Sequence, residues 1–134
     1  MIFGVGVDIA SVQRMKAAME RHPRLRERLF TQAEIETCSQ KSDPYASFAA
    51  RFAAKEAFAK ALGTGLATGL RWTDIEVTNL AAGRPALVTR GNAAELLKGL
   101  GDGSVHLSLT HDRGIAAAVC LIEVPSMSPT APNH

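Results

Sequence analysis

The stretch PYASFAARFAAKEAFAKALG, residues 44–63, decides the fold. It follows Asp43, and an aspartate before a proline is a strong helix start, because the carboxylate caps free N–H groups and proline suits the first turn. Gly63 is a natural residue for the position after the last turn. The pattern therefore predicts one long helix over residues 44–62.

One position of this helix does not fit a simple apolar stripe. The stripe that includes Phe48, Phe52 and Leu62 has Glu56 at its edge, one turn beyond Phe52. A carboxylate at the border of a core needs a partner. Glu56 and Lys60, four residues apart, could form an ordinary ion pair on the helix surface, or Glu56 could serve a ligand. The pattern leaves both interpretations open.

A second informative stretch is IFGVGVDI, residues 2–9, which is typical of a buried strand. By alternation Gly4, Gly6 and Asp8 share one face of this strand, so two residues without side chains lead up to a carboxylate. We expect something to approach that face closely. Asp8 either caps the helix that follows or serves a ligand.

The remaining segments predict short helices, strands and turns. The expected helices cover residues 12–21, with Ser11 as N-cap, 31–39, with a capping box, and 92–98. The expected strands cover residues 72–78, 85–89, 104–110 and 115–123, the last two as a hairpin. These elements indicate an α+β fold, an antiparallel sheet packed against the long helix. One domain is expected over residues 1–124, followed by a disordered tail over 125–134.

Composition limits the class of protein. The 134 residues are 46% apolar and 21% charged, which suits one ordinary globular domain. No run approaches the roughly 20 apolar residues that a membrane span needs. Cys38 and Cys120 lack the spacing of a redox or metal motif and are interpreted as reduced thiols. Since the first residues do not fit a signal peptide either, a cytoplasmic protein is expected.

Positive charge is concentrated in one segment. Residues 14–28 carry six basic and two acidic side chains, in a chain whose net charge is only +2. Arg14 and Arg21 lie seven residues apart, on one side of the predicted helix. The segment suits an acidic partner, whether a protein, a nucleic acid or a phosphate-bearing ligand, or else it is a solvated helix face.

Histidines and glycines add weaker signals. His106 lies on the polar face of the strand over residues 104–110 and is most simply an exposed strand histidine. The segment TGLATG, residues 64–69, is a loop whose backbone amides could approach a ligand. A zinc site from His106, His111 and Asp112 is disfavoured, because the spacing lacks paired ligands and no cysteine joins it.

Three segments together resemble one family in order, spacing and residue type. They are GVGVDI at residues 4–9, with Arg14 six residues beyond the aspartate, RFAAKEAFAKALGTG at residues 51–65, and HLSLTH at residues 106–111. The central segment is the most specific of the three. On these motifs the chain resembles the holo-[acyl-carrier-protein] synthases, short single-module members of the 4′-phosphopantetheinyl transferases.

The resemblance implies an enzyme that transfers the phosphopantetheine arm of coenzyme A to a serine of apo-acyl carrier protein. The reaction releases adenosine 3′,5′-bisphosphate and supports fatty acid biosynthesis. The resemblance also implies that Asp8 and Glu56 hold Mg²⁺, with Mn²⁺ as an alternative, and such oxygen ligands suit Mg²⁺ beside a pyrophosphate. Lys60 would contact phosphate oxygens or move a proton from the serine. The candidate catalytic residues are therefore Asp8, Glu56 and Lys60, and whether Glu56 acts as a base stays open.

The same resemblance implies binding sites for both substrates. Coenzyme A carries several phosphates, for which the candidate contacts are Arg51, Lys55, Gly63, Thr64, Gly65 and His106. The acidic helix of the carrier protein would meet Arg14, Arg21 and Arg24. Family members of this length are usually homotrimers with active sites at subunit boundaries, so the same assembly is implied here.

Two other classes of function fit less well. A nucleic-acid-binding module would use the basic segment, but the chain has one Trp and one Tyr, so platforms for base stacking are lacking. A non-catalytic coenzyme A binder would need no metal and make no product. We therefore expect neither a nucleic acid nor a membrane as partner.

Overall fold

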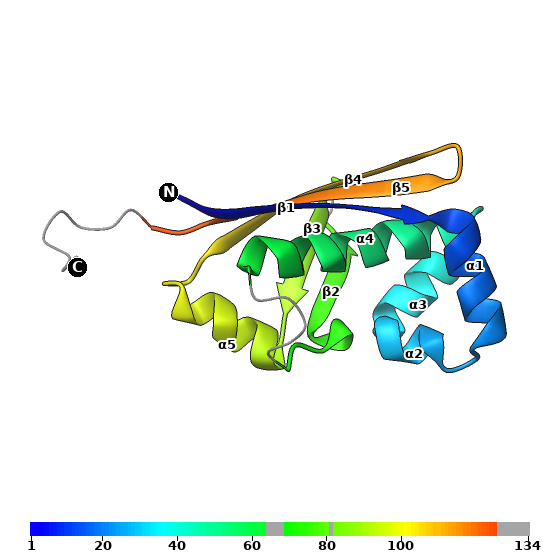
Figure 1. Ribbon diagram of the computed structural model, residues 1–134, viewed down its shortest axis with the longest axis horizontal. Coiled ribbons are helices and arrows are strands. Elements are labelled where there is room, and N and C mark those ends of the chain that lie inside the picture. Colours follow the sequence, from blue (N-terminus) through cyan, green and yellow to red (C-terminus); the bar gives the residue numbers. More distant parts are fainter. Residues whose placement is uncertain (64–68, 81, 126–134) are drawn as a thin grey trace, which may run out of the picture.

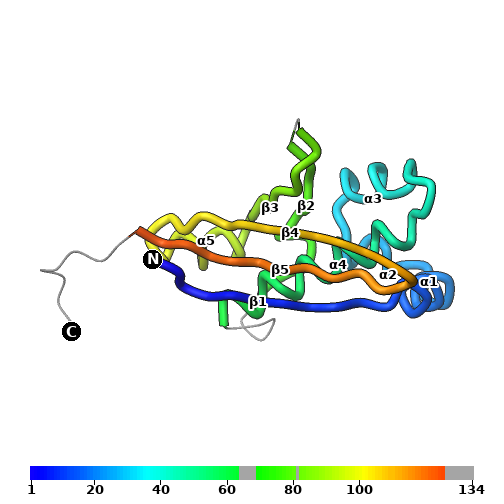
Figure 2. The backbone as a smooth tube through the Cα atoms, turned by 90° about the horizontal axis from the view of Figure 1, so that it is seen from above, coloured from blue at the N-terminus to red at the C-terminus, as the bar shows by residue number. Residues whose placement is uncertain are grey.

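The computed structural model describes residues 1–63, 69–80 and 82–125. Its centre is a three-stranded antiparallel sheet of order β1-β5-β4, which lies on one long helix (Figure 1). These elements are β1 (Ile2–Ser11), β4 (Ser104–Asp112), β5 (Ile115–Glu123) and α4 (Pro44–Leu62). Seen from above, the three strands run side by side with α4 beneath them (Figure 2). The predicted α+β class, an antiparallel sheet on a long helix, is confirmed.

Smaller elements flank this pair of layers. Three short helices gather at one end of α4: α1 (Val12–Arg21), α2 (Leu25–Leu29) and α3 (Gln32–Ser39) (Figure 1). Below α4 in the same view lie the 3₁₀ turn η2 (Trp72–Asp74), the hairpin of β2 (Ile75–Asn79) and β3 (Pro85–Thr89), and α5 (Gly91–Gly99). The loop expected over residues 64–69, except Gly69, and the tail expected over 125–134, except Pro125, fall outside the described residues.

Capping residues fix the helix ends as the sequence predicts. The side chain of Asp43 accepts a hydrogen bond in the first turn of α4, and Gly63 ends the helix with a left-handed φ of 80°. Ser11 caps α1. Thr31 and Glu34 satisfy each other's backbone N–H groups in a capping box at the start of α3. Local capping therefore fixes where these helices begin and where α4 ends.

The strand β1 lies in close contact with α4. Gly4 and Gly6 face the helix, and a Cβ atom at Gly4 or Gly6 would overlap the backbone carbonyl oxygen of Ala61 or Ala57, respectively. The expected close approach to this face is confirmed, and the approaching group is the backbone of α4. Asp8 is the next residue on the same face of β1, so its carboxylate lies alongside the helix.

The sheet topology differs from the prediction in one respect. The hairpin β2-β3 forms its own two-stranded sheet instead of joining β1, β4 and β5. Residues 72–74 form a 3₁₀ turn rather than the start of a strand, because the carbonyl of Trp72 accepts hydrogen bonds from the N–H of Ile75 and from the ammonium of Lys55. That carbonyl is therefore not free for a strand ladder.

Two smaller elements were also predicted inexactly. The turn between β4 and β5 consists only of Arg113 and Gly114, whose φ angles of 50° and 79° suit a two-residue hairpin turn. The expected turn residues His111 and Asp112 therefore belong to β4. The helix α2 was not predicted, because its five residues carry no side-chain cap.

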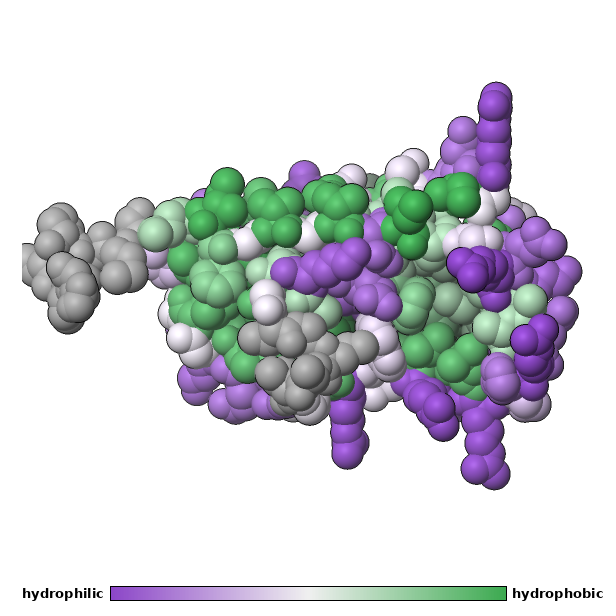
Figure 3. Space-filling model, in the orientation of Figure 1, coloured by the Kyte–Doolittle hydropathy of each residue, from purple (hydrophilic) through white to green (hydrophobic). Residues whose placement is uncertain are grey.

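The outer face of the sheet, directed away from α4, is apolar and exposed. Alternate residues of β1 and β5 point outward there, and the exposed ones include Val5, Val7, Ile9, Ile115 and Val119. Figure 3 shows an apolar band along the upper edge of the molecule, over β1. A contiguous exposed apolar face of this kind marks an interaction surface. None of the helices in the described ranges is long and apolar enough to cross a membrane.

Candidate active site

Asp8, Glu56 and Lys60 come together where β1 crosses α4. Lys60 Nζ donates to Asp8 Oδ1 at 2.8 Å and to the carbonyl oxygen of Val7 at 3.1 Å. Glu56 is half-buried, and its pKa is raised above the ordinary value, first by burial and then by repulsion from Asp8, while Lys60 opposes the shift. Two carboxylates that repel each other beside one ammonium group are an arrangement suited to binding a cation.

These contacts argue against the purely local role that the sequence allows for Asp8 and for Glu56. Asp8 is not the cap of α1, since Ser11 fills that role. Lys60 forms its hydrogen-bonded ion pair with Asp8 rather than with Glu56 on its own helix. The hydrogen bond that Lys60 donates to Asp8 raises the pKa of Lys60 above its ordinary value, so Lys60 stays protonated at neutral pH. A protonated Lys60 can neutralise phosphate charge but cannot accept a proton.

The donor set fits a hard divalent cation such as Mg²⁺. That ion is typically held by one or two carboxylates together with substrate phosphates and water, not by a cage of protein ligands. In keeping with this, the described part of the chain contains no group of three or more His, Cys, Asp or Glu residues that could enclose a metal. Two carboxylates, Asp8 on a strand and Glu56 on a helix, provide the smaller set that Mg²⁺ needs beside a phosphate ligand.

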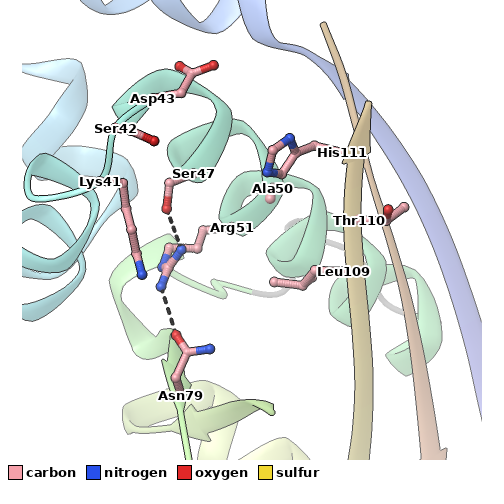
Figure 4. Close-up of a pocket in the computed structure, with 10 residues that line it drawn as sticks. All are labelled: Lys41, Ser42, Asp43, Ser47, Ala50, Arg51, Asn79, Leu109, Thr110 and His111. Atoms are coloured by element: carbon pink, nitrogen blue, oxygen red, sulfur yellow. Dashed lines mark hydrogen bonds between the residues drawn. The ribbon is translucent and has the colours of Figure 1, made fainter. Parts of the chain in front are cut away.

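A second site is a cationic pocket between α4 and the strands β4 and β2 (Figure 4). The pocket has a volume of about 300 Å³. Its walls combine basic, hydroxyl and amide side chains, including Lys41, Ser47, Arg51, Asn79 and His111. The composition is suited to an anionic ligand that carries oxygen atoms.

Arg51 is the central cation of this pocket. Only 5% of the residue is exposed. Its Nη1 donates to Ser47 Oγ at 2.6 Å and its Nη2 to Asn79 Oδ1 at 3.2 Å, as drawn in Figure 4. Its Nε is buried and has no hydrogen-bond partner among the described residues. Asp43 also lines the pocket, but it forms no ion pair with Arg51. A buried guanidinium with unused donor capacity is well placed for a bound anion.

The cationic pocket and the two carboxylates lie on different sides of the chain. The pocket is lined by β4, whereas Asp8 belongs to β1, and β5 separates these strands. Arg51 and Glu56 are five residues apart in α4, which places them about 140° apart around the helix axis. One chain therefore presents two separate polar sites rather than one continuous site.

Comparisons with known proteins identify the family of the chain. A family model described as the 4′-phosphopantetheinyl transferase superfamily matches residues 4–120. The chain belongs to this superfamily. Among relatives of the transferase, the holo-[acyl-carrier-protein] synthase of Streptomyces coelicolor is 51% identical over 122 residues, covering 91% of this chain and 98% of the relative. That of Moorella thermoacetica is 47% identical over 118 residues, covering 88% and 91%.

Solved structures of similar proteins match the fold of the transferase closely. The crystal structure of the Neisseria meningitidis holo-[acyl-carrier-protein] synthase has a TM-score of 0.83 at 33% identity, covering 92% of this chain and 99% of that one. A Bacillus anthracis synthase solved with coenzyme A (3′,5′-ADP) has a TM-score of 0.77 at 33% identity, covering 93% and 99%. The family resemblance and the assignment as an enzyme of the transferase class, both made from the sequence, are confirmed.

Lys55 does not lie where it could make the contact with coenzyme A that the sequence analysis expects. Lys55 is fully buried, and its ammonium donates to Glu34 Oε1 at 2.7 Å, to the carbonyl of Leu29 at 2.8 Å and to that of Trp72 at 3.0 Å. All three N–H groups are used, so none remains for a phosphate. Helix periodicity alone could not reveal this, because the acceptors lie on three other elements.

His106 lies apart from both polar sites of the transferase. It is exposed and its Nε2 lies 3.0 Å from Glu123 Oε1. By strand alternation it shares the outer face of the sheet, whereas His111 points to the side of α4 and lines the cationic pocket. Within one chain, His106 therefore cannot reach the pocket, and His111 and Lys41 are the pocket residues that the sequence analysis missed. The strict alternation of β4 was the signal that could have separated the two histidines.

The remaining predicted residues are located as follows. Arg14, Arg21 and Arg24 are exposed along α1 and the turn that follows it. The guanidinium of the neighbouring Arg26 packs over the Phe48 ring at 5.4 Å. Gly63 ends α4, while Thr64 and Gly65 lie outside the described residues.

An apolar groove of about 420 Å³ lies next to Arg14. It is lined mainly by apolar residues of β1, α1, α2, α4 and η2, including Ile9, Met15, Leu25, Leu29, Phe52 and Trp72. The rings of Phe52 and Trp72 pack with centroids 5.2 Å apart. Because Ile9 follows Asp8 and Phe52 lies one turn before Glu56, the groove adjoins the carboxylate site.

Proposed function

We propose that the chain transfers 4′-phosphopantetheine from coenzyme A to a serine hydroxyl of apo-acyl carrier protein. The observation that carries this proposal is the pair of facing carboxylates, Asp8 and Glu56, with protonated Lys60 beside them, in a chain of the phosphopantetheinyl transferase superfamily. In the reaction the serine oxygen bonds to the pantetheine-bearing phosphorus, the P–O bond to the nucleotide breaks, and the serine proton is released. The products are holo-acyl carrier protein and adenosine 3′,5′-bisphosphate.

Each residue of the carboxylate site has a role in this reaction. Asp8 and Glu56 would hold Mg²⁺ or Mn²⁺, which when bound neutralises charge on the pyrophosphate. Lys60 stabilises negative charge on the phosphate oxygens as the nucleotide leaves. Since the hydrogen bond to Asp8 keeps Lys60 protonated, we assign it electrostatic stabilisation and not the removal of the serine proton.

The cationic pocket is proposed to bind the 3′-phosphate of coenzyme A. Arg51 offers a buried, unpartnered Nε, and Lys41 and His111 lie in the same pocket. A phosphate monoester supplies the oxygen acceptors that such a set of donors requires. This proposal replaces Lys55 and His106 by Lys41 and His111 among the candidate coenzyme A contacts and retains Arg51, Gly63, Thr64 and Gly65.

We propose a homotrimer in which neighbouring copies complete each active site. One coenzyme A molecule carries both the pyrophosphate and the 3′-phosphate, yet each chain holds its carboxylates at β1 and its cationic pocket at β4. If the β1 side of one copy contacts the β4 side of the next, the interface holds both the carboxylates and the cationic pocket. Repetition of this head-to-tail contact around three copies would close a ring. The exposed apolar outer face supports association between copies.

The carrier protein is proposed to dock on α1. Arg14, Arg21 and Arg24 supply positive charge for an acidic helix, and the apolar groove next to Arg14 accepts side chains beside the reacting serine. We also propose that the holo-carrier serves fatty acid biosynthesis and that the reaction takes place in the cytoplasm. In agreement with a reducing compartment, Cys38 and Cys120 are both free thiols.

The first test is the intact mass of apo-acyl carrier protein after incubation with the protein, coenzyme A and Mg²⁺. We expect the carrier to gain one phosphopantetheine group, and we expect a chelator to prevent the gain. A second incubation with Mn²⁺ decides whether that ion can replace Mg²⁺. A carrier whose mass never changes with either metal would overturn the proposed activity.

Arg51→Met tests the coenzyme A pocket. Removal of the buried guanidinium is expected to raise the KM for coenzyme A about tenfold or more, because a charged donor to a phosphate is lost. The KM for the carrier protein should stay close to that of the wild type. Arg113→Met is the matched control, since that side chain is 93% exposed at the β4-β5 turn. Equal effects of the two substitutions would contradict the assignment.

Mixed oligomers test the shared active site. Arg51→Met damages the cationic pocket and Glu56→Gln damages the carboxylate site. Each mixed trimer therefore contains one interface at which an intact carboxylate site faces an intact pocket. Co-expression of the two variants is expected to give several times the activity of either alone at low coenzyme A concentration. Light scattering gives the mass of the assembly. Mixed oligomers that form without any gain in activity would show that each chain holds a complete site.

A further inference from the structure

The most highly connected buried polar group in the described chain is the ion pair of Lys55 and Glu34. Both side chains are fully buried, and their charged atoms lie 2.7 Å apart. Glu34 Oε1 also accepts from the N–H of Thr31, and its Oε2 accepts from the N–H of Val77 at 2.9 Å. The pair thus ties α4 to α3 and to β2, although neither residue belongs to the carboxylate site or the cationic pocket.

The other two hydrogen bonds of Lys55 lead to the apolar groove. Its Nζ donates to the carbonyl oxygens of Leu29 and Trp72. These two residues come from α2 and η2, which lie more than 40 residues apart in the sequence, and both line the groove. One ammonium group therefore holds two separate walls of the groove at a fixed distance from α4.

Lys55 is also the residue before Glu56 in α4. A shift of α2 or η2 relative to Lys55 would change where the groove lies with respect to the Glu56 carboxylate. The precision required is high, because in transfer reactions a displacement of about 1 Å of a bound substrate can lower the rate about 100-fold.

We propose that Lys55 is a positioning residue that aligns the apolar groove, and so the carrier protein, with the carboxylate site. This inference rests on the proposed function, in which the groove binds the carrier beside its reacting serine. Lys55 touches neither substrate and acts through the backbones of Leu29 and Trp72. Stability alone does not account for the pair, because a buried ion pair is often no more stabilising than apolar side chains of similar size.

The test uses the full chain with Glu34 and Lys55 replaced together, as Glu34→Gln with Lys55→Met. Replacing both residues avoids leaving one buried charge unpaired, which alone could prevent folding. The control is Phe58→Leu, a substitution of a fully buried residue of α4 that packs in a different part of the core. The wild type, the double variant and the control are compared by far-UV circular dichroism, by Trp72 fluorescence and by steady-state kinetics.

We expect the double variant to keep its far-UV spectrum and to shift the emission of Trp72, which is the single tryptophan of the chain. We expect its KM for the carrier protein to rise about tenfold, which is the size of effect seen when a contact near the centre of a protein–protein interface is lost. Its KM for coenzyme A should stay within about twofold of the wild-type value. The control should change neither KM nor the emission. An unshifted emission with an unchanged KM for the carrier would overturn the inference, and so would equal increases in both KM values.

Failure of the proposed function gives a different result. In that case the wild type itself would transfer nothing to the carrier, whatever the state of Lys55. Carrier binding and Trp72 emission would then be measured directly by titration. Weaker carrier binding by the double variant with shifted emission would still support the positioning role, and equal binding by both proteins would contradict it.

Discussion

Glu56→Gln is expected to lower the rate of phosphopantetheine transfer by about 10²–10³-fold or more while the protein stays folded. Glutamine keeps the size of the side chain and removes its negative charge, so Asp8 would be left as the single carboxylate for a divalent cation. The loss should appear mainly in kcat and in the metal concentration needed for activity. The KM for the carrier protein should change little, because Arg14 and the apolar groove are untouched.

The folded state should tolerate this change well. Burial and the neighbouring Asp8 raise the pKa of Glu56 in the folded protein, so the folded state disfavours the carboxylate relative to the unfolded chain. As the pH rises from the ordinary glutamate pKa of the unfolded chain through the raised pKa of Glu56, the free energy of unfolding of the metal-free wild type falls. The glutamine variant does not titrate there and keeps this stability. At neutral pH and without metal, the variant should be at least as stable as the wild type.

Thermal unfolding with and without Mg²⁺ separates the two effects. Mg²⁺ is expected to raise the Tm of the wild type, because a ligand that binds only the folded state stabilises it, and to have a smaller effect on the variant. Glu95→Gln is the matched control, since Glu95 is an exposed residue of α5. If Glu56→Gln transferred phosphopantetheine as fast as Glu95→Gln, Glu56 would not be a metal ligand.

The parts of the fold that the sequence could predict are those governed by neighbours along the chain. Asp43 and Gly63 fix the ends of α4 through contacts within one turn, so its length follows from the sequence alone. Gly4 and Gly6 indicated a close approach, because alternation along a strand places them with Asp8. The pairing of Asp8 with Lys60 could be anticipated only as part of a family pattern, since 52 residues separate them.

The parts that could not be predicted depend on contacts between distant elements. Lys55 looks like an exposed helix lysine in the sequence, and only the meeting of α2, α3 and η2 around it makes it a core residue. The cationic pocket likewise combines Lys41, Asn79 and His111 from three separate segments. No local pattern signals such an encounter. For the same reason the separate sheet of β2 and β3 was missed.

Gly6→Ala is expected to lower the stability of the folded chain strongly. The new Cβ would overlap the carbonyl oxygen of Ala57 and approach the backbone N of Ala61 to 2.9 Å. These are backbone atoms of the central helix, held by its hydrogen bonds, so they cannot turn aside as the end of a side chain can. Overpacking of an interior typically costs about 1–3 kcal/mol, and with rigid backbone as the obstacle we expect a loss of about 3 kcal/mol or more.

The consequence for activity follows from the strand. If β1 moves outward to admit the methyl group, Asp8, two residues further along the same face, moves away from Glu56 and Lys60. Transfer should therefore fall even under conditions where the variant remains folded.

Gly99→Ala is the control, because a Cβ there meets nothing within 4 Å and alanine favours the helix α5. Urea unfolding at one fixed protein concentration compares the variants, since association between copies adds to the apparent stability. Equal midpoints for Gly6→Ala and the wild type would mean that β1 can move away from α4 at little cost, and the close contact would then not be what sets the distance between the two carboxylates.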